Sequence, residues 1–92
     1  MYRLKEGYLL KEVAGEYVLF PTGQSVVEGK NIVRVNEAGK YIVERLQEGI
    51  EFNALINVQA EKYEATQEDI PKLVADTDFF LSKLRLQGLL IE

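Results

Sequence analysis

The sequence predicts an α+β domain in which a three-stranded antiparallel sheet is followed by three helices. The first third of the chain is rich in β-branched and aromatic residues interrupted by glycine and proline, which is typical of short strands and turns. From residue 36 onward, apolar residues recur at three- and four-residue spacing, which is typical of helices packed on one side. At 92 residues, the chain can form a single domain, 1–92, around one hydrophobic core. This order of elements is compatible with a winged-helix-like fold.

The first two strands are predicted over residues 8–13 and 16–20, and they form a hairpin. Gly15 lies in the turn between them and can supply the positive φ that a tight hairpin needs. Pro21 ends the pairing, because proline has no N–H to donate to a neighbouring strand. Residues 22–30 are rich in glycine and polar residues and are predicted to form a loop.

The third strand is predicted over residues 31–35. Alternation along a strand puts Ile32 and Arg34 on one face, and the simplest interpretation of Arg34 is a solvent-facing residue. Val33 and Val35 then lie on the other face. If nothing pairs with the outer edge of this strand, its N–H and C=O groups are available to a foreign extended peptide.

The helices are predicted over residues 37–47, 51–63 and 69–87. Asn36 is a good N-cap for the first helix, and Gly49 is placed to end it. Gly39 in its first turn costs roughly 1 kcal/mol of helix propensity relative to alanine, which indicates the close approach of another backbone. The buried side of this helix is predicted to hold Ala38, Tyr41, Ile42 and Leu46.

The second helix has a weak start, because Glu51 suits the helix dipole but is not a strong capping residue. The third helix has two possible caps, Thr66 and Asp69. Pro71 favours Asp69, because proline is tolerated only in the first turn of a helix. The last apolar residues, 89–91, are predicted to form a short strand or an apolar plug.

The third helix carries apolar residues on two opposite sides. At about 100° per residue, one broad face holds Ile70, Leu73, Val74, Thr77, Phe80, Leu81 and Leu84. The opposite side holds Ala75, Phe79 and Leu86. A helix on a simple core needs only the first face. Periodicity leaves two alternatives equally open: the second side is covered by the first helix or by the end of the chain, or it is a binding face.

Composition excludes several kinds of site. The chain has no cysteine and no histidine, which removes disulfides, thiolate catalysis, iron–sulfur ligation, the commonest general base and the commonest metal ligand. Fifteen acidic residues in 92 make chance carboxylate pairs common, so the acidic residues between Glu64 and Asp78 are interpreted as a solvated surface. No glycine-rich phosphate loop is present. No catalytic residue, metal ligand, cofactor or enzyme activity is therefore predicted.

The net charge of −4 argues against a partner held through its phosphates, so no nucleic acid is expected. No apolar run approaches the ~20 residues of a membrane helix, and the first residues do not read as a signal peptide. No membrane association is therefore expected, and the expected location is the cytoplasm.

Two alternative functions follow from the predicted fold. The first alternative is a DNA-binding or regulatory module, because winged-helix-like domains often bind DNA. Its recognition helix would mix Lys72, Lys83 and Arg85 with acidic residues, which is not the basic surface that DNA requires. The other is a structural homodimeric subunit that pairs edge to edge through the third strand.

Three segments of the chain resemble the pyrroloquinoline-quinone biosynthesis protein D (PqqD) family. Residues 35–39, Val-Asn-Glu-Ala-Gly, resemble the Leu-Asn-Glu-Thr-Gly signature that opens the first helix of that family. Residues 7–17 resemble its first hairpin. Its closing pattern of Asp, an aliphatic residue, Phe-Leu, Leu and Gly-Leu-Leu/Ile is matched by Asp76-Thr77, Phe80-Leu81, Leu84 and Gly88-Leu89-Leu90. The departures from the family are Val35 for Leu, Ala38 for Thr, Thr77 for an aliphatic residue and Glu51 for a small polar cap.

The resemblance implies a precursor-peptide recognition element, a non-catalytic adaptor and chaperone for a ribosomally made, modified peptide (RiPP). In that family, the leader of the peptide adds as an extra strand along the third strand and packs against the third helix. The adaptor presents it to a modifying enzyme, often a radical S-adenosylmethionine (SAM) enzyme, as in pyrroloquinoline quinone (PQQ) biosynthesis. The implied peptide-binding residues are Asn31, Ile32, Val33, Arg34, Val35, Lys72, Ala75, Asp76, Phe79 and Lys83. The two lysines would favour a leader that carries acidic residues.

Overall fold

The computed structural model describes residues 1–23 and 32–92. A three-stranded antiparallel sheet is formed, in this order, by β2 (Tyr8–Val13), β3 (Glu16–Pro21) and β4 (Val33–Val35). It is followed by the helices α2 (Glu37–Glu48), α3 (Phe52–Lys62) and α4 (Ile70–Leu86). The predicted α+β fold class is confirmed, and the described part of each predicted element lies close to its expected bounds. Asn31 and the predicted loop residues 24–30 lie outside the described residues.

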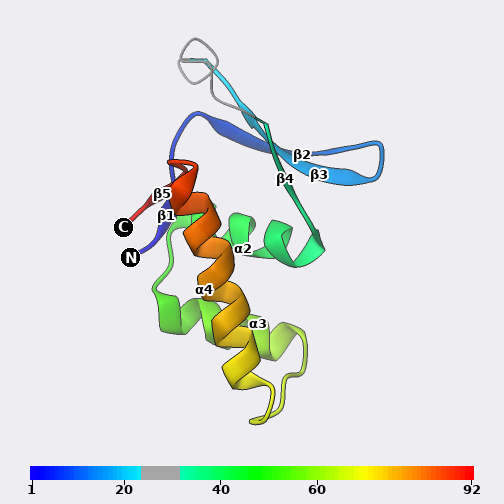
Figure 1. Ribbon diagram of the computed structural model, residues 1–92, viewed down its shortest axis with the longest axis vertical. Coiled ribbons are helices and arrows are strands. Elements are labelled where there is room, and N and C mark those ends of the chain that lie inside the picture. The colour runs from blue at the N-terminus through cyan, green and yellow to red at the C-terminus, as the bar shows by residue number, and fades with distance from the viewer. Residues whose placement is uncertain (24–31) are drawn as a thin grey trace.

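The sheet lies at one end of the molecule and the three helices at the other, with α4 crossing α2 and α3 (Figure 1). A separate two-stranded sheet pairs β1 (Arg3–Leu4) with β5 (Leu90–Ile91), so that the two ends of the chain lie side by side. The expected short strand at the end of the chain is thus present. Its partner β1 was not predicted, because two residues carry no periodicity. Among the described residues, no helix is long and apolar enough to cross a membrane.

The hairpin forms as predicted, with one small difference at its end. Gly15 has a φ of 83° in the turn, and the preceding Ala14 is also left-handed at 53°. Pro21 is still paired, with Tyr8, so that β3 is one residue longer than expected. Proline is tolerated there because it is the last residue of the strand.

The start of α2 is capped as predicted, but its buried face is rotated relative to the prediction. The side-chain oxygen of Asn36 accepts a hydrogen bond of 2.7 Å from the Gly39 amide. The residues that α2 buries are Gly39, Ile42, Val43 and Leu46. The assignment of Ala38 to the buried face was wrong, since it is exposed, and Tyr41 is only half-buried. Small residues such as Ala38 contribute little to an apolar pattern, so they locate a face poorly.

The reason for the glycine in α2 is also different from the expected one. A Cβ atom at Gly39 would lie 2.8 Å from Cε1 and 3.1 Å from Cζ of Phe80, on α4. The group that approaches Gly39 is therefore an aromatic ring and not another backbone. Gly39 lets α4 lie close to the first turn of α2.

The other two helix starts lack a side-chain cap. Glu51 makes no capping hydrogen bond at α3, as expected. Asp69 directly precedes α4, but its carboxylate caps no amide of that helix. It instead accepts a hydrogen bond of 2.9 Å from the Thr66 amide and one of 3.1 Å from the Thr66 hydroxyl. These bonds hold the pKa of the Asp69 carboxyl below its ordinary value. Asp69 is the N-cap residue of α4, as Pro71 predicted, but its side chain bonds to Thr66 and not to the helix.

One side of α4 is buried in the core, and the opposite side is exposed. Thr77, Leu81 and Leu84 are buried in or beside the core, where the three helices meet β1 and β3. On the opposite side, Phe79 is 67% exposed and Leu86 is 89% exposed, and Ala75 is exposed as well. No described residue covers this side. The alternative in which the first helix or the end of the chain covers it is not what the structure shows.

Candidate functional site

The first part of the candidate site is the outer edge of β4. In the described part of the sheet, β4 is an edge strand, with β3 as its neighbour on one side only. Val35 is buried in the core, whereas Ile32 and Arg34 are exposed. Arg34 lies 4.0 Å from Glu16 of β3, a contact between two exposed side chains. The outer edge therefore has backbone groups that no described residue pairs with, and the core-facing Val35 holds the strand in place.

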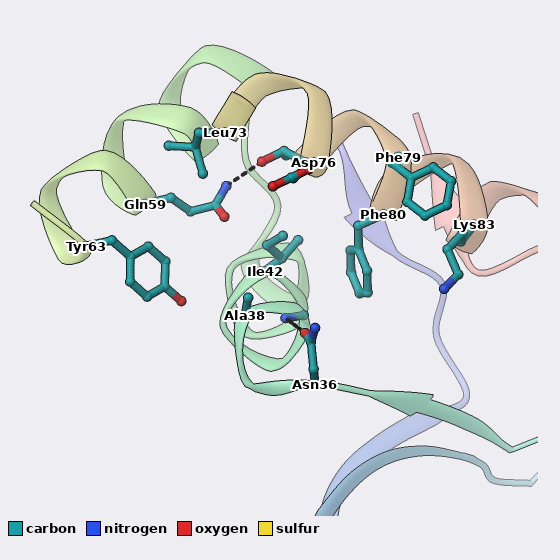
Figure 2. Close-up of a pocket in the computed structure, with 12 residues that line it drawn as sticks. Asn36, Ala38, Ile42, Gln59, Tyr63, Leu73, Asp76, Phe79, Phe80 and Lys83 are labelled. Atoms are coloured by element: carbon teal, nitrogen blue, oxygen red, sulfur yellow. Dashed lines mark hydrogen bonds between the residues drawn. The ribbon is translucent and has the colours of Figure 1, made fainter. Parts of the chain in front are cut away.

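The second part is a pocket of about 500 Å³ that begins at Asn36, the residue that directly follows β4. We call it the helix pocket, because its walls come from α2, α3 and α4 (Figure 2). Ala38, Gly39 and Ile42 line it from α2. The residues that line it from α4 are Leu73, Asp76, Thr77, Phe79, Phe80 and Lys83. The edge of β4 thus ends at the mouth of a half-open, mainly apolar space.

The base of the helix pocket is polar. Gln59 of α3 is only 2% exposed and lines the pocket beside Tyr63, which follows α3. Its amide nitrogen donates to the Thr77 hydroxyl at 3.0 Å and to the Leu55 carbonyl at 3.2 Å. The amide nitrogen of Gln59 and the hydroxyl of Thr77 are therefore paired across the contact between α3 and α4.

Tyr63 forms the outer wall of the pocket on the α3 side. Its ring packs edge to face against Tyr41, with 6.2 Å between ring centroids, and the Lys62 ammonium lies over both rings. Partial burial raises the pKa of the Tyr63 phenol, with smaller contributions from Glu37 and Tyr41. The phenol therefore stays protonated near neutral pH.

Three of the predicted site residues on α4 come together at the pocket mouth. Asp76, Phe79 and Lys83 line the pocket, and the Lys83 ammonium lies 5.6 Å from the centre of the Phe79 ring. Lys72 and Ala75 are exposed on α4 but do not line it. Lys72 instead bonds to Asp76 at 2.9 Å, one helical turn away. This ion pair engages Lys72, and Lys83 remains as the cation at the mouth.

Sequence reasoning missed the interior of the pocket. Gln59 carries no signal, because a glutamine within a helix is ordinarily read as exposed. Phe80 was assigned to the buried face of α4, and it is half-buried because one side of its ring faces the pocket. Asn36 and Gly39 were predicted as a cap, a close contact and part of the family signature, but not as lining residues of a pocket. The resemblance predicted Asp76, Phe79 and Lys83, which lie at the rim of the pocket. The base, with Gln59, is formed by the packing of three helices, which the sequence does not reveal.

The described residues were compared with the side-chain groups that hold a metal ion or relay a proton. No group of three or more His, Cys, Asp or Glu side chains that could hold a metal ion occurs in the described part of the chain. The chain lacks histidine and cysteine altogether. The features that do converge, a free strand edge and an apolar pocket, are those of a binding site.

Two solved structures share this fold. One is described as "TbiB1 in Complex with the TbiA(beta) Leader Peptide"; it is 18% identical, the match covers 96% of this chain and 93% of that chain, and the TM-score is 0.71. The other is described as "Lasso peptide synthetase B1 complexed with the leader peptide"; it is 16% identical, with coverage of 99% and 98% and a TM-score of 0.72. At these identities the likeness establishes the fold. A search of curated proteins finds no matching sequence.

A comparison with protein families gives a more specific result. The family model described as "Coenzyme PQQ synthesis protein D (PqqD)" matches residues 9–90. The match runs from the first hairpin to the strand that ends the chain, so it includes β4, the helix pocket and all of α4. The chain belongs to the PqqD family.

Proposed function

We propose that this protein is an adaptor that binds the leader of a ribosomally made precursor peptide by strand addition. The observation that carries the proposal is the position of the free β4 edge, which ends at the mouth of the helix pocket. An extended peptide paired with β4 can form backbone hydrogen bonds along the edge and place a side chain in the pocket. Backbone pairing gives affinity for any extended segment, and the pocket gives selectivity.

The exposed face of α4 supports the same arrangement. An aromatic ring that is 67% exposed, as Phe79 is, gains stability when a partner removes it from water. Phe79 lies on the pocket rim, where a peptide on β4 would contact it. Lys83 beside it favours an acidic residue in the peptide. Lys72 contributes less to this preference, since Asp76 already neutralises it.

The comparisons support the nature of the ligand. The two solved structures with this fold are both described as complexes with a leader peptide. The adaptor itself is proposed to be non-catalytic. Its second partner is proposed to be a modifying enzyme of the radical SAM class that acts on the bound peptide. Coenzyme PQQ synthesis, which gives the family its name, is one process that such an adaptor serves.

The proposal is tested by titrating ¹⁵N-labelled protein with the synthetic leader of a short precursor gene adjacent to the gene for this protein. Chemical-shift changes are expected in β4 and along residues 76–83 of α4. Changes confined to the β1–β5 sheet, none of whose residues lines the helix pocket, would remove this placement of the peptide.

Phe79→Ala and Leu86→Ala form a matched pair of variants for the same titration. Both remove an exposed apolar side chain from α4, but only Phe79 lines the pocket. Phe79→Ala is expected to weaken peptide binding by at least about 1 kcal/mol, or roughly fivefold, and to leave the thermal midpoint unchanged. Leu86→Ala is expected to change neither. Equal losses of affinity in the two variants would show that the peptide does not use the pocket rim.

Two further measurements separate the alternatives. The cations of α4 are partly neutralised, since Lys72 pairs with Asp76 and Arg85 pairs with Glu92 at 2.9 Å. We therefore expect no salt-dependent retention on heparin, and strong retention would favour a nucleic-acid-binding module instead. Light scattering without peptide is expected to give a monomer, whereas a dimer that dissociates when the leader is added would indicate that β4 first pairs with a second copy.

A further inference from the structure

The side chain at the base of the helix pocket has one hydrogen-bonding group left over. Both N–H groups of the Gln59 amide are used, one by the Leu55 carbonyl and one by the Thr77 hydroxyl. The orientation of the amide is fixed by chemistry, because a carbonyl oxygen can only accept a hydrogen bond and so must face the nitrogen. The amide oxygen must therefore point the other way.

That oxygen faces the pocket. Figure 2 shows it directed away from the bond to Thr77 and into the space between Tyr63 and Ile42. It accepts no hydrogen bond from any described residue. The side chain as a whole is 2% exposed, so a group that fills the pocket also cuts this acceptor off from water. An occupant without a donor would leave it unpaired, which is unfavourable.

The other lining residues of the pocket determine what kind of side chain, apart from its donor, can be bound. Ile42, Leu73 and Phe80 supply apolar walls, and Phe79 and Tyr63 supply aromatic rings near the mouth. The volume of about 500 Å³ lies within the usual range of about 300–1,000 Å³ for small-molecule sites. Serine or threonine on a bound peptide is too short to fill such a space and also reach its base.

We propose that the helix pocket accepts one side chain of the bound peptide that has an aromatic ring and a neutral hydrogen-bond donor, and that Gln59 Oε1 accepts that hydrogen bond. This inference rests on the proposed function and names what the peptide must carry. Phenol and indole side chains meet the requirement, and a phenylalanine side chain does not. Gln59 is then the residue that determines specificity at this site.

The lack of a charged partner among the described residues at the base of the pocket excludes charged side chains of the peptide. A lysine or arginine head group at the base would have to leave water, and no described carboxylate lies there to compensate. The carboxylate on the pocket lining, Asp76, is already paired with Lys72. Carboxylates of the peptide have no donor at the base, because both N–H groups of Gln59 are used. Asparagine and glutamine are neutral donors too, but they would bury their own amide oxygen against apolar walls, so a neutral donor on an apolar ring fits best.

The test needs no knowledge of the natural peptide. ¹⁵N-labelled protein is titrated with p-cresol, which is the tyrosine side chain, and with toluene, which has the same ring and no donor. p-Cresol is expected to bind about fivefold more tightly, as one additional hydrogen bond implies, although toluene is the more hydrophobic probe. The signals expected to shift are the side-chain amide of Gln59 and the backbone amide of Gly39. Toluene binding as tight as p-cresol binding, or no binding of either, would overturn the proposal.

Gln59→Met and Gln47→Met form a matched pair of variants. Methionine keeps the length of the side chain and removes the acceptor, and Gln47 is an exposed residue of α2 that does not line the pocket. The preference for p-cresol is expected to disappear in Gln59→Met and to remain in Gln47→Met. If Gln59→Met fails to fold, the comparison of p-cresol with toluene on the unaltered protein still tests the proposal. A leader that binds along β4 while p-cresol does not bind would refute this inference and leave the proposed function intact.

Discussion

Replacing Gly39 with alanine tests how closely α4 is packed on α2. The new Cβ would lie 2.8 Å from Cε1 of Phe80, whereas carbon atoms in contact prefer about 3.5–4.0 Å. The ring must therefore retreat by about 0.7 Å or more. Overpacking of this kind costs about 1–3 kcal/mol. Alanine also gains up to about 1 kcal/mol of helix propensity over glycine. The net effect of Gly39→Ala is expected to be a destabilisation of about 0–3 kcal/mol.

A double-mutant cycle with Phe80→Ala isolates the contact. Without the ring, only the gain in helix propensity remains, so Gly39→Ala is expected to stabilise the Phe80→Ala protein by up to about 1 kcal/mol. The measurement is chemical denaturation followed by circular dichroism. Because the ring retreats toward the pocket, Gly39→Ala is also expected to weaken p-cresol binding. The same free-energy change in both backgrounds would refute the idea that Phe80 is the reason for the glycine.

Three further predictions concern single interactions. Asn36→Ala removes the oxygen that accepts from the Gly39 amide and should cost about 1 kcal/mol in chemical denaturation. Thr77→Val leaves one N–H of the buried Gln59 without its acceptor and should cost about 1–3 kcal/mol in the same assay, whereas Leu86→Ala, at an exposed position, should cost almost nothing. The lowered pKa of Asp69 means that its ionised form is favoured by folding, so its contribution is present near neutral pH and is lost as pH falls through the folded-state pKa. The difference in thermal midpoint between the unaltered protein and Asp69→Asn should accordingly shrink below about pH 4.

The sequence predicted the order of the elements because its signals there are local. Gly15 and Pro21 mark the ends of the hairpin strands, and Asn36 and Gly49 mark the ends of α2. Each of these residues acts on the backbone within a few positions, so it can be recognised without knowing what lies across the core. The two-sided pattern of α4 is local in the same sense, and the second side that it identified, with Phe79, is exposed in the structure.

What could not be predicted depends on contacts between distant segments. β1 forms because Arg3 pairs with Ile91 and Leu4 pairs with Leu90. A strand of two residues has no sequence pattern from which this pairing could be predicted. The rotation of α2 follows from its contact with the Phe80 ring, which buries Gly39 and leaves Ala38 exposed. Gln59 is buried because Thr77 meets it from another helix. The base of the pocket is thus a property of packing, whereas its rim follows from the pattern of one helix.

The rim and the base of the helix pocket differ in how binding is linked to folding. Phe79 and Lys83 are exposed and make few contacts that the fold needs, so substitutions there can change the preferred peptide at little cost in stability. Gln59 serves both purposes, because its N–H groups join α3 to α4 while its oxygen is left for the ligand. A substitution that removes the acceptor also removes these two bonds. We therefore expect affinity to be tuned at the rim, while the requirement for a donor in the peptide stays fixed by the packing of the helices.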